Sequence, residues 1–90
     1  MDIVEQVKGL LQSKKLIIGR DRVLKALNAG ELAHVYVAKN IPADMREDIE
    51  YYSGMQNVQV DVVPLDNEEL GILAKRGHFI SVLGLPQWNV

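Results

Sequence analysis

The residues of this chain that could act on a ligand are six of its ten basic side chains, which gather in three short segments. Residues 19–25, 39–40 and 75–78 hold six Lys or Arg side chains and one acid, a local net charge of +5. The remaining residues hold four basic and eleven acidic side chains, a net charge of −7, so the total of −2 hides an uneven distribution. Clustered cations provide the positive field that phosphate groups require. The six basic residues are Arg20, Arg22, Lys25, Lys39, Lys75 and Arg76.

The elements that must position these cations alternate between helical and strand periodicity. Asp2 with Glu5, and Asp66 with Glu69, have the spacing of a capping box, and Gly30 and Gly77 are placed as helix C-terminal caps. The pattern predicts helices within residues 3–15, 20–30, 42–54 and 66–77, and strands at 16–18, 32–38, 58–62 and 79–85. This alternation is typical of an α/β protein with helices on both faces of one sheet.

The order of these elements predicts where the basic segments meet. Segments that follow parallel strands gather at one edge of a sheet, where ligands bind in open α/β folds. Residues 19–25 follow the first predicted strand and residues 39–40 follow the second, so we expect both at the same edge. Residues 19–25 also begin a helix, whose free N–H groups favour an anionic phosphate.

Patterns for catalysis or metal binding are weak in this chain. The seven glycines form no phosphate-binding loop, there is no cysteine, and His34 and His78 lie 44 positions apart without further ligands nearby. The carboxylates Glu47, Asp48 and Glu50 share one predicted helix, and a solvated helix face explains them better than an acid–base pair. We therefore expect no enzyme activity, no cofactor, no metal and no small-molecule substrate.

Length and hydropathy limit the organisation of the chain. Its 90 residues suit a single domain spanning residues 1–90, with no room for an appended activity. Glu5 and Lys8 interrupt the apolar pattern of the first dozen residues, so we expect no signal peptide. No stretch approaches the length of a membrane span. The expectation is a cytoplasmic protein without a membrane partner.

Several stretches resemble one known family. They are GRDRVLK at residues 19–25, AKN at 38–40, EDIEYY at 47–52, ELG at 69–71 and RGHFIS at 76–81. In this order and spacing, the chain is similar to the kink-turn-binding ribosomal proteins of archaea and eukaryotes, the L-thirty-e branch of the L-seven-Ae superfamily. The resemblance implies a three-layer α/β/α sandwich around a four-stranded mixed sheet. It also implies a non-catalytic protein that binds a kink-turn or related internal loop of RNA, usually in the large ribosomal subunit.

The resemblance also implies roles for individual residues. The turn at Gly19 would let the backbone approach the RNA chain, and Lys25 with neighbouring basic residues would meet phosphates. Asn40 would contact RNA from the loop after the second strand, and residues 75–80 would touch extruded bases. The resulting RNA-binding set is Gly19, Arg20, Arg22, Lys25, Lys39, Asn40, Lys75, Arg76, Gly77, His78 and Ile80. The expected partners are ribosomal RNA or another kink-turn RNA, with ribosomal proteins as further candidate partners.

Two other functions fit parts of the sequence. A protein-interaction module, or a non-ribosomal ribonucleoprotein of the same fold, would explain Asp21, the acidic third helix and the apolar tail with Trp88. A small hydrolase would use Glu68, Glu69 and His78. A helix cap, a first-turn charge and a loop contact explain these three residues without catalysis.

Overall fold

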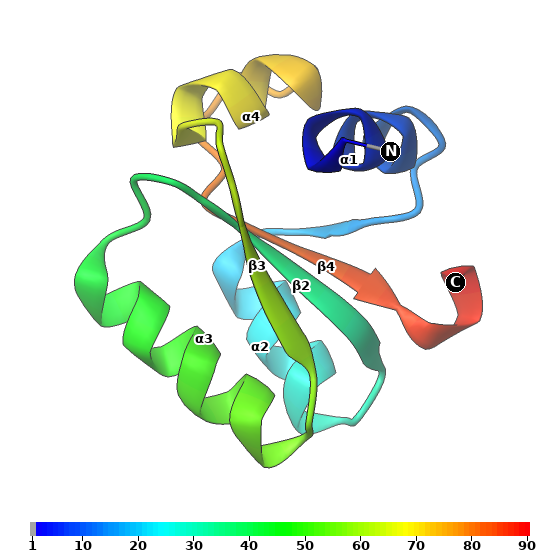
Figure 1. Ribbon diagram of the computed structural model, residues 1–90, viewed down its shortest axis with the longest axis vertical. Helices are drawn as coiled ribbons and strands as arrows, with labels where there is room; N and C mark the ends of the chain where they lie inside the picture. The colour runs from blue at the N-terminus through cyan, green and yellow to red at the C-terminus, as the bar shows by residue number, and fades with distance from the viewer. Residues whose placement is uncertain (1) are drawn as a thin grey trace.

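The computed structural model describes residues 2–90, which form four α-helices and four strands in strict alternation (Figure 1). A 3₁₀ helix, η1 (Gln87–Asn89), follows the last strand. The helices are α1 (Ile3–Gln12), α2 (Arg20–Asn28), α3 (Ala43–Met55) and α4 (Asn67–Leu73). The strands are β1 (Ile17–Ile18), β2 (Leu32–Ala38), β3 (Gln59–Val63) and β4 (Val82–Pro86).

The four strands form one mixed sheet in the order β1-β4-β2-β3. Strand β4 is antiparallel to both β1 and β2, whereas β2 and β3 are parallel. The carboxyl ends of β1, β2 and β3 and the start of β4 therefore lie at the same end of the sheet. We call this end, with the loops that leave it, the loop edge. This topology confirms that residues 19–25 and 39–40 emerge at the same edge.

Helices cover both faces of the sheet and enclose two separate cores. Helices α1 and α4 lie on one side, and α2 and α3 lie on the other (Figure 1). Neighbouring residues of β2 alternate between the cores, because Tyr36 packs with Leu70 of α4 while Val37 packs with Ile49 of α3. The three-layer α/β/α sandwich with a four-stranded mixed sheet is thus confirmed.

The helix caps follow the sequence at most positions. Asp66 and Glu69 form the predicted capping box, and Asp2 accepts a hydrogen bond from the Val4 N–H at 3.0 Å. Gly30 adopts φ +70° after α2, where the Glu31 N–H donates to the Ala26 carbonyl at 3.0 Å. This hydrogen bond marks a Schellman motif, which requires a left-handed residue and so explains the glycine.

Helix α4 ends at Leu73, earlier than the predicted cap at Gly77 implies. Lys75 takes the left-handed conformation, with φ +57°. Its N–H donates to the Ile72 carbonyl, and the Arg76 N–H donates to the Gly71 carbonyl. The prediction of Gly77 as the cap is wrong, because these backbone hydrogen bonds already close the helix at Lys75.

Strand β4 begins later than residues 79–85 predict. The Ile80 N–H donates to the carbonyl of Asn67, at the start of α4, at 3.0 Å. That hydrogen bond takes residue 80 out of strand pairing, so ladder pairing with β2 starts at Val82. None of the helices within residues 2–90 has the length and hydropathy of a membrane span.

Candidate nucleic-acid interface

Backbone hydrogen bonds join the segments at the loop edge. The Gly19 N–H donates to the Val82 carbonyl at 3.1 Å, and the Ala38 N–H donates to the Ser81 carbonyl at 2.9 Å. The Lys39 N–H donates to the Leu65 carbonyl at 2.9 Å. The segments that follow β1, β2 and β3 and precede β4 are thereby held in a fixed arrangement.

Gly19 forms the turn between β1 and α2. Its φ of +105° lies in a region that L side chains rarely adopt, and no heavy atom lies within 4 Å of a Cβ built there. Gly19 is also the N-cap of α2 and has no side chain to bind the first N–H groups of the helix. The open start of α2 can therefore accept an anion, as helix N-termini commonly do.

Asn40 forms a reciprocal contact with the first residue of α4. Its Oδ1 accepts from the Asn67 N–H at 2.8 Å, and its Nδ2 donates to Asn67 Oδ1 at 3.1 Å. The side chain is exposed, so ligand contact and this structural role can coexist. Asn67 was not identified from the sequence, because the spacing of residues 40 and 67 does not predict a contact between them.

The basic residues of α2 are not equivalent. Arg20 donates a hydrogen bond to Asp48 of α3 at 2.8 Å, which raises the pKa of the guanidinium above its ordinary value. Arg22 and Lys25 are exposed and form no ion pair within residues 2–90, and the same is true of Lys39. The side chains of Arg22, Lys25 and Lys39 thus remain available for phosphate, whereas part of the charge of Arg20 is already compensated.

The loop before β4 differs from the expected surface at one position. Ile80 is 2% exposed and belongs to the core under α1 and α4, so it leaves the set of surface candidates. Its neighbour Phe79 is 66% exposed and takes its place as the apolar side chain of this loop. Gly77 and His78 are exposed beside it. Phe79 and Ile80 are adjacent apolar residues outside a strand. The sequence therefore does not show which of the two faces the core.

A glycine of α4 allows this loop to approach the helix. A Cβ added at Gly71 would overlap the carbonyl oxygen of His78. The loop can therefore pack on α4 only with glycine at this position, which gives the ELG stretch a structural reason. Sequence reasoning found the motif but not this packing.

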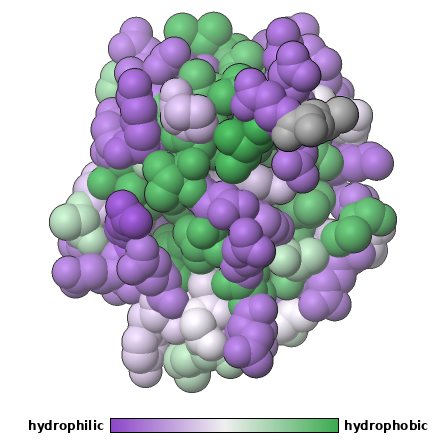
Figure 2. Space-filling view, in the orientation of Figure 1, coloured by the Kyte–Doolittle hydropathy of each residue, from purple (hydrophilic) through white to green (hydrophobic). Residues whose placement is uncertain are grey.

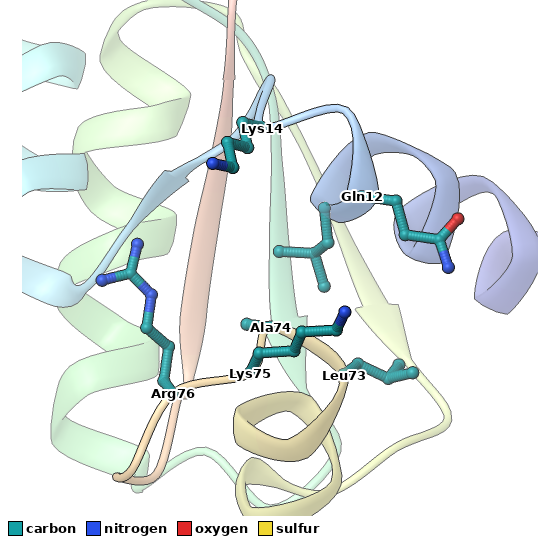
Figure 3. A pocket seen from close by; sticks show the side chains of 7 residues that line it. Gln12, Lys14, Leu73, Ala74, Lys75 and Arg76 are labelled. Atoms are coloured by element: carbon teal, nitrogen blue, oxygen red, sulfur yellow. The ribbon is translucent and has the colours of Figure 1, made fainter.

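Lys75 and Arg76 follow α4 and line a different hollow from Arg22 and Lys25 of α2. They line a hollow of about 570 Å³ together with Gln12 and Lys14, which come from the end of α1 and the turn after it (Figure 3). Because α4 and α2 cover opposite faces of the sheet, the basic residues divide into two groups. Lys14 was missed as a candidate, since helix-end capping fully accounts for a lysine at that position in the sequence.

The two histidines occupy unrelated environments. His34 Nε2 lies 2.7 Å from Asp61 Oδ2 on the neighbouring strand, and its ring stacks on Tyr36 at 4.5 Å between centroids. His78 belongs to the exposed loop before β4. No group of three or more metal-ligating side chains gathers within residues 2–90.

These features define a class of protein: an α/β/α domain whose sheet edge presents a glycine turn, an open helix N-terminus and unpaired cations. The chain belongs to the Ribosomal protein L7Ae/L30e/S12e/Gadd45 family, whose model matches residues 1–86. The family resemblance inferred from residues 19–81 is thereby confirmed. Membership of a ribosomal protein family also agrees with the expectation of a non-catalytic chain.

Individual relatives point to one branch of this family. The chain is 39% identical to the large ribosomal subunit protein eL30 of Pyrobaculum neutrophilum, over 94% of this chain and 84% of the relative. It is 32% identical to the eL30 protein of Methanopyrus kandleri, over 93% and 77% respectively. A solved structure of a protein of unknown function from Bacillus halodurans superposes with a TM-score of 0.74 at 21% identity, covering 83% of this chain and 74% of that one. The last match supports the fold alone.

Proposed function

We propose that this chain is a ribosome-associated RNA-binding protein that recognises a kink-turn or related internal loop at its loop edge. The observation that carries the proposal is the Gly19 turn, which opens the N-terminus of α2 beside the unpaired cations Arg22 and Lys25. Membership of a ribosomal protein family and eL30 relatives that span most of the chain support a role in the large subunit. A role of this kind implies a cytoplasmic protein that contacts ribosomal RNA.

In this proposal, phosphates position the RNA on two sides of the loop edge. The N-terminus of α2, Arg22 and Lys25 take phosphates on one side, and Lys39 takes another from the loop after β2. Lys75 and Arg76 take a phosphate at the hollow on the α1–α4 side. A bent RNA can reach both faces of the sheet around its edge, whereas a straight duplex meets only one group at a time.

Unpaired bases would be read between these two groups of cations. Phe79 offers an exposed ring for stacking, and Asn40 can direct polar atoms toward base edges. The acids Asp21 and Asp48 lie beside Arg20 and offset part of the positive charge at the same edge. Binding therefore depends on RNA shape, which agrees with a protein whose net charge is only −2.

A titration at several salt concentrations tests this function. We expect a kink-turn RNA to bind more tightly than a straight duplex of equal length, with affinity that falls as salt rises. Replacing Arg22 and Lys25 together by Ala should weaken binding and reduce the salt slope by about 0.7–0.9 for each phosphate that the variant no longer neutralises. Lys8→Ala, an exposed lysine on α1, serves as the matched control. Equal binding to both RNAs, or affinity independent of salt, would contradict the proposal.

Association with the ribosome is tested separately. Tagged protein in a lysate of its own source should co-sediment with large subunits in a sucrose gradient, and high salt should release it. The Arg22→Ala, Lys25→Ala double variant should shift toward the top of the gradient. If the protein still co-sediments at high salt and with the double substitution, contacts with ribosomal proteins, and not contacts with RNA, hold it on the ribosome.

A protein-interaction role is the second candidate, and one surface feature favours it. Val4, Leu65, Ile72 and Leu73 line an open groove between α1 and α4, and the side chain of Ile72 is exposed. Figure 2 shows apolar side chains gathered between these helices. Ile72→Lys should abolish a protein contact there, and RNA affinity is measured in the same variant because Ile72 also lines a hollow with Phe79 and His78. Loss of ribosome association without loss of RNA affinity would favour a ribosomal protein as a second partner.

A further inference from the structure

The last residues of the chain fold back on the domain and hold Trp88 in a fixed position. The Gln87 N–H donates to the Glu31 carbonyl at 2.8 Å, before the start of β2. Two residues later, Asn89 Nδ2 donates to the Lys15 carbonyl at 3.0 Å, before β1. Trp88 lies between these two anchors, yet its side chain is 64% exposed. The flanking hydrogen bonds therefore hold the indole at the surface, where it does not contribute to the hydrophobic core.

Cations of α2 border the same surface. Trp88 lines a hollow of about 310 Å³ with Arg22 and Lys25. Arg22 and Lys25 are three residues apart on α2, so they lie on one side of that helix. Ile17 and Ala26 form the apolar floor of the hollow, and Glu31 contributes one carboxylate. Two cations against one acid leave the surface net positive.

An exposed indole next to cations is the combination that binds single-stranded nucleic acid. Every base has a face that can stack on an aromatic ring, while Lys and Arg take the phosphates on either side. Arg22 and Lys25 belong to the phosphate-binding group of the proposed function, so the Trp88 surface continues that group along α2. The carboxylate of Glu31 disfavours a phosphate near itself and leaves the α2 side as the favourable place for one.

We propose that Trp88 stacks on an unpaired base of the bound RNA, with the adjoining phosphates at Arg22 and Lys25. This inference rests on the proposed function and extends it to a nucleotide that flanks the internal loop. An acidic protein surface would also suit two cations. Stacking of RNA is preferred because these cations continue the group that begins at Gly19.

The single tryptophan of the chain provides a direct measurement. We expect its fluorescence to be quenched on binding of a kink-turn RNA that carries a single-stranded extension of a few adenosines. The same RNA without the extension reaches Arg22 and Lys25 but offers no base to the indole, so it should quench the fluorescence much less. A single-stranded oligoadenylate alone should quench it at higher concentration. An acidic peptide such as oligoglutamate should not change it.

Variants then connect the signal to affinity, measured by anisotropy of a labelled RNA. Trp88→Ala should reduce affinity for the extended RNA about tenfold, the effect expected for one stacked base. Trp88→Phe should restore part of that loss. Affinity for the unextended RNA should not change in either variant. Tyr51→Ala is the matched control, since Tyr51 is also 64% exposed but lies on α3.

The outcomes separate this inference from the proposed function. If unextended kink-turn RNA binds as expected while the extension adds neither affinity nor quenching, the Trp88 proposal is overturned and the proposed function stands. If kink-turn and duplex RNA bind equally but oligoadenylate still quenches Trp88, the proposed function fails and the stacking site stands. Quenching by oligoglutamate instead of RNA would overturn the stacking site in favour of a protein contact.

Discussion

Asn40 and Asn67 hold each other through both ends of the Asn40 amide, with Oδ1 accepting from the Asn67 N–H at 2.8 Å and Nδ2 donating to Asn67 Oδ1 at 3.1 Å. The pair connects the loop after β2 to the first residue of α4. A side chain that both donates and accepts is needed for this contact, which gives a structural reason for asparagine at position 40. It also couples two segments of the proposed interface.

Two substitutions at position 40 separate its structural role from its role toward RNA. Asn40→Ala should lower the free energy of unfolding by about 1 kcal/mol, because two exposed hydrogen bonds are removed. Asn40→Asp can still accept from the Asn67 N–H, and a carboxylate is favourable near the start of α4, so stability should be close to that of the parent. RNA affinity should nevertheless fall, because the new charge repels phosphate.

Urea unfolding and RNA anisotropy measure these two quantities. The Ala variant should lose stability and affinity together, whereas the Asp variant should lose affinity alone. An Asp variant that binds RNA as tightly as the parent would show that residue 40 lies outside the RNA contact.

The packing of the loop before β4 on α4 predicts a steric effect at Gly71. Gly71→Ala introduces a Cβ that overlaps the His78 carbonyl oxygen, a backbone atom that cannot move without displacing the loop. We expect a loss of about 1–3 kcal/mol in the free energy of unfolding, together with weaker RNA binding. Gly9→Ala is the matched control, because nothing lies within 4 Å of its added Cβ on α1. That variant should be stabilised by about 0.5–1 kcal/mol. Similar stabilities for the two variants, measured by urea unfolding, would contradict the packing argument.

Gly19 predicts a conformational effect instead of a steric one. A Cβ at this position would meet nothing within 4 Å, but φ is +105°. Gly19→Ala should therefore cost about 1–3 kcal/mol of stability through backbone strain, unless the turn changes shape. In either case the start of α2 is disturbed, and affinity for a kink-turn RNA should fall. Gly54→Ala on α3, which also has open space around its Cβ, should leave RNA affinity unchanged. Unaltered binding by Gly19→Ala would remove the helix N-terminus from the proposed site.

Patterns of neighbouring residues predicted the helices and strands well, because helix caps and strand periodicity depend on residues that are close in the sequence. The apolar run LAHVYVA spans β2 with its predicted bounds, and Asp66 with Glu69 forms the predicted capping box. Gly30 caps α2 because its position demands a left-handed backbone. Gly77 failed as a cap because Lys75 adopts that conformation instead, which residue type alone does not reveal.

Tertiary contacts explain why the candidate site was less predictable than the fold. Ile80 is buried because its N–H is held by the start of α4, and this contact turns Phe79 outward. Arg20 looked as free as Arg22 in the sequence, but Asp48 of a different helix binds it. Such contacts join residues that are far apart along the chain, so no local period encodes them.

Tyr36 predicts a loss of stability at alkaline pH. Its side chain is 1% exposed, and its hydroxyl has no hydrogen-bond partner within residues 2–90. Burial, with a smaller contribution from the charge of Asp61, raises the pKa of the phenol above its ordinary value of 10.0. The unfolded chain therefore loses this proton at a lower pH than the folded protein does. The stability that the protonated phenol contributes is fully present below about pH 10, and it is lost as pH rises above that value.

Between the pKa values of Tyr36 in the unfolded and folded states, the free energy of unfolding should fall by up to about 1.4 kcal/mol per pH unit because of this one group. Tyr36→Phe removes the ionisation and also the unpaired buried hydroxyl, so it should be at least as stable as the parent at neutral pH and more resistant at high pH. Urea unfolding at about pH 8 and about pH 11 measures both effects. Tyr51→Phe is the control, because it removes the same hydroxyl group from an exposed side chain. An equal alkaline loss in the parent and in Tyr36→Phe would assign the effect to other titrating groups.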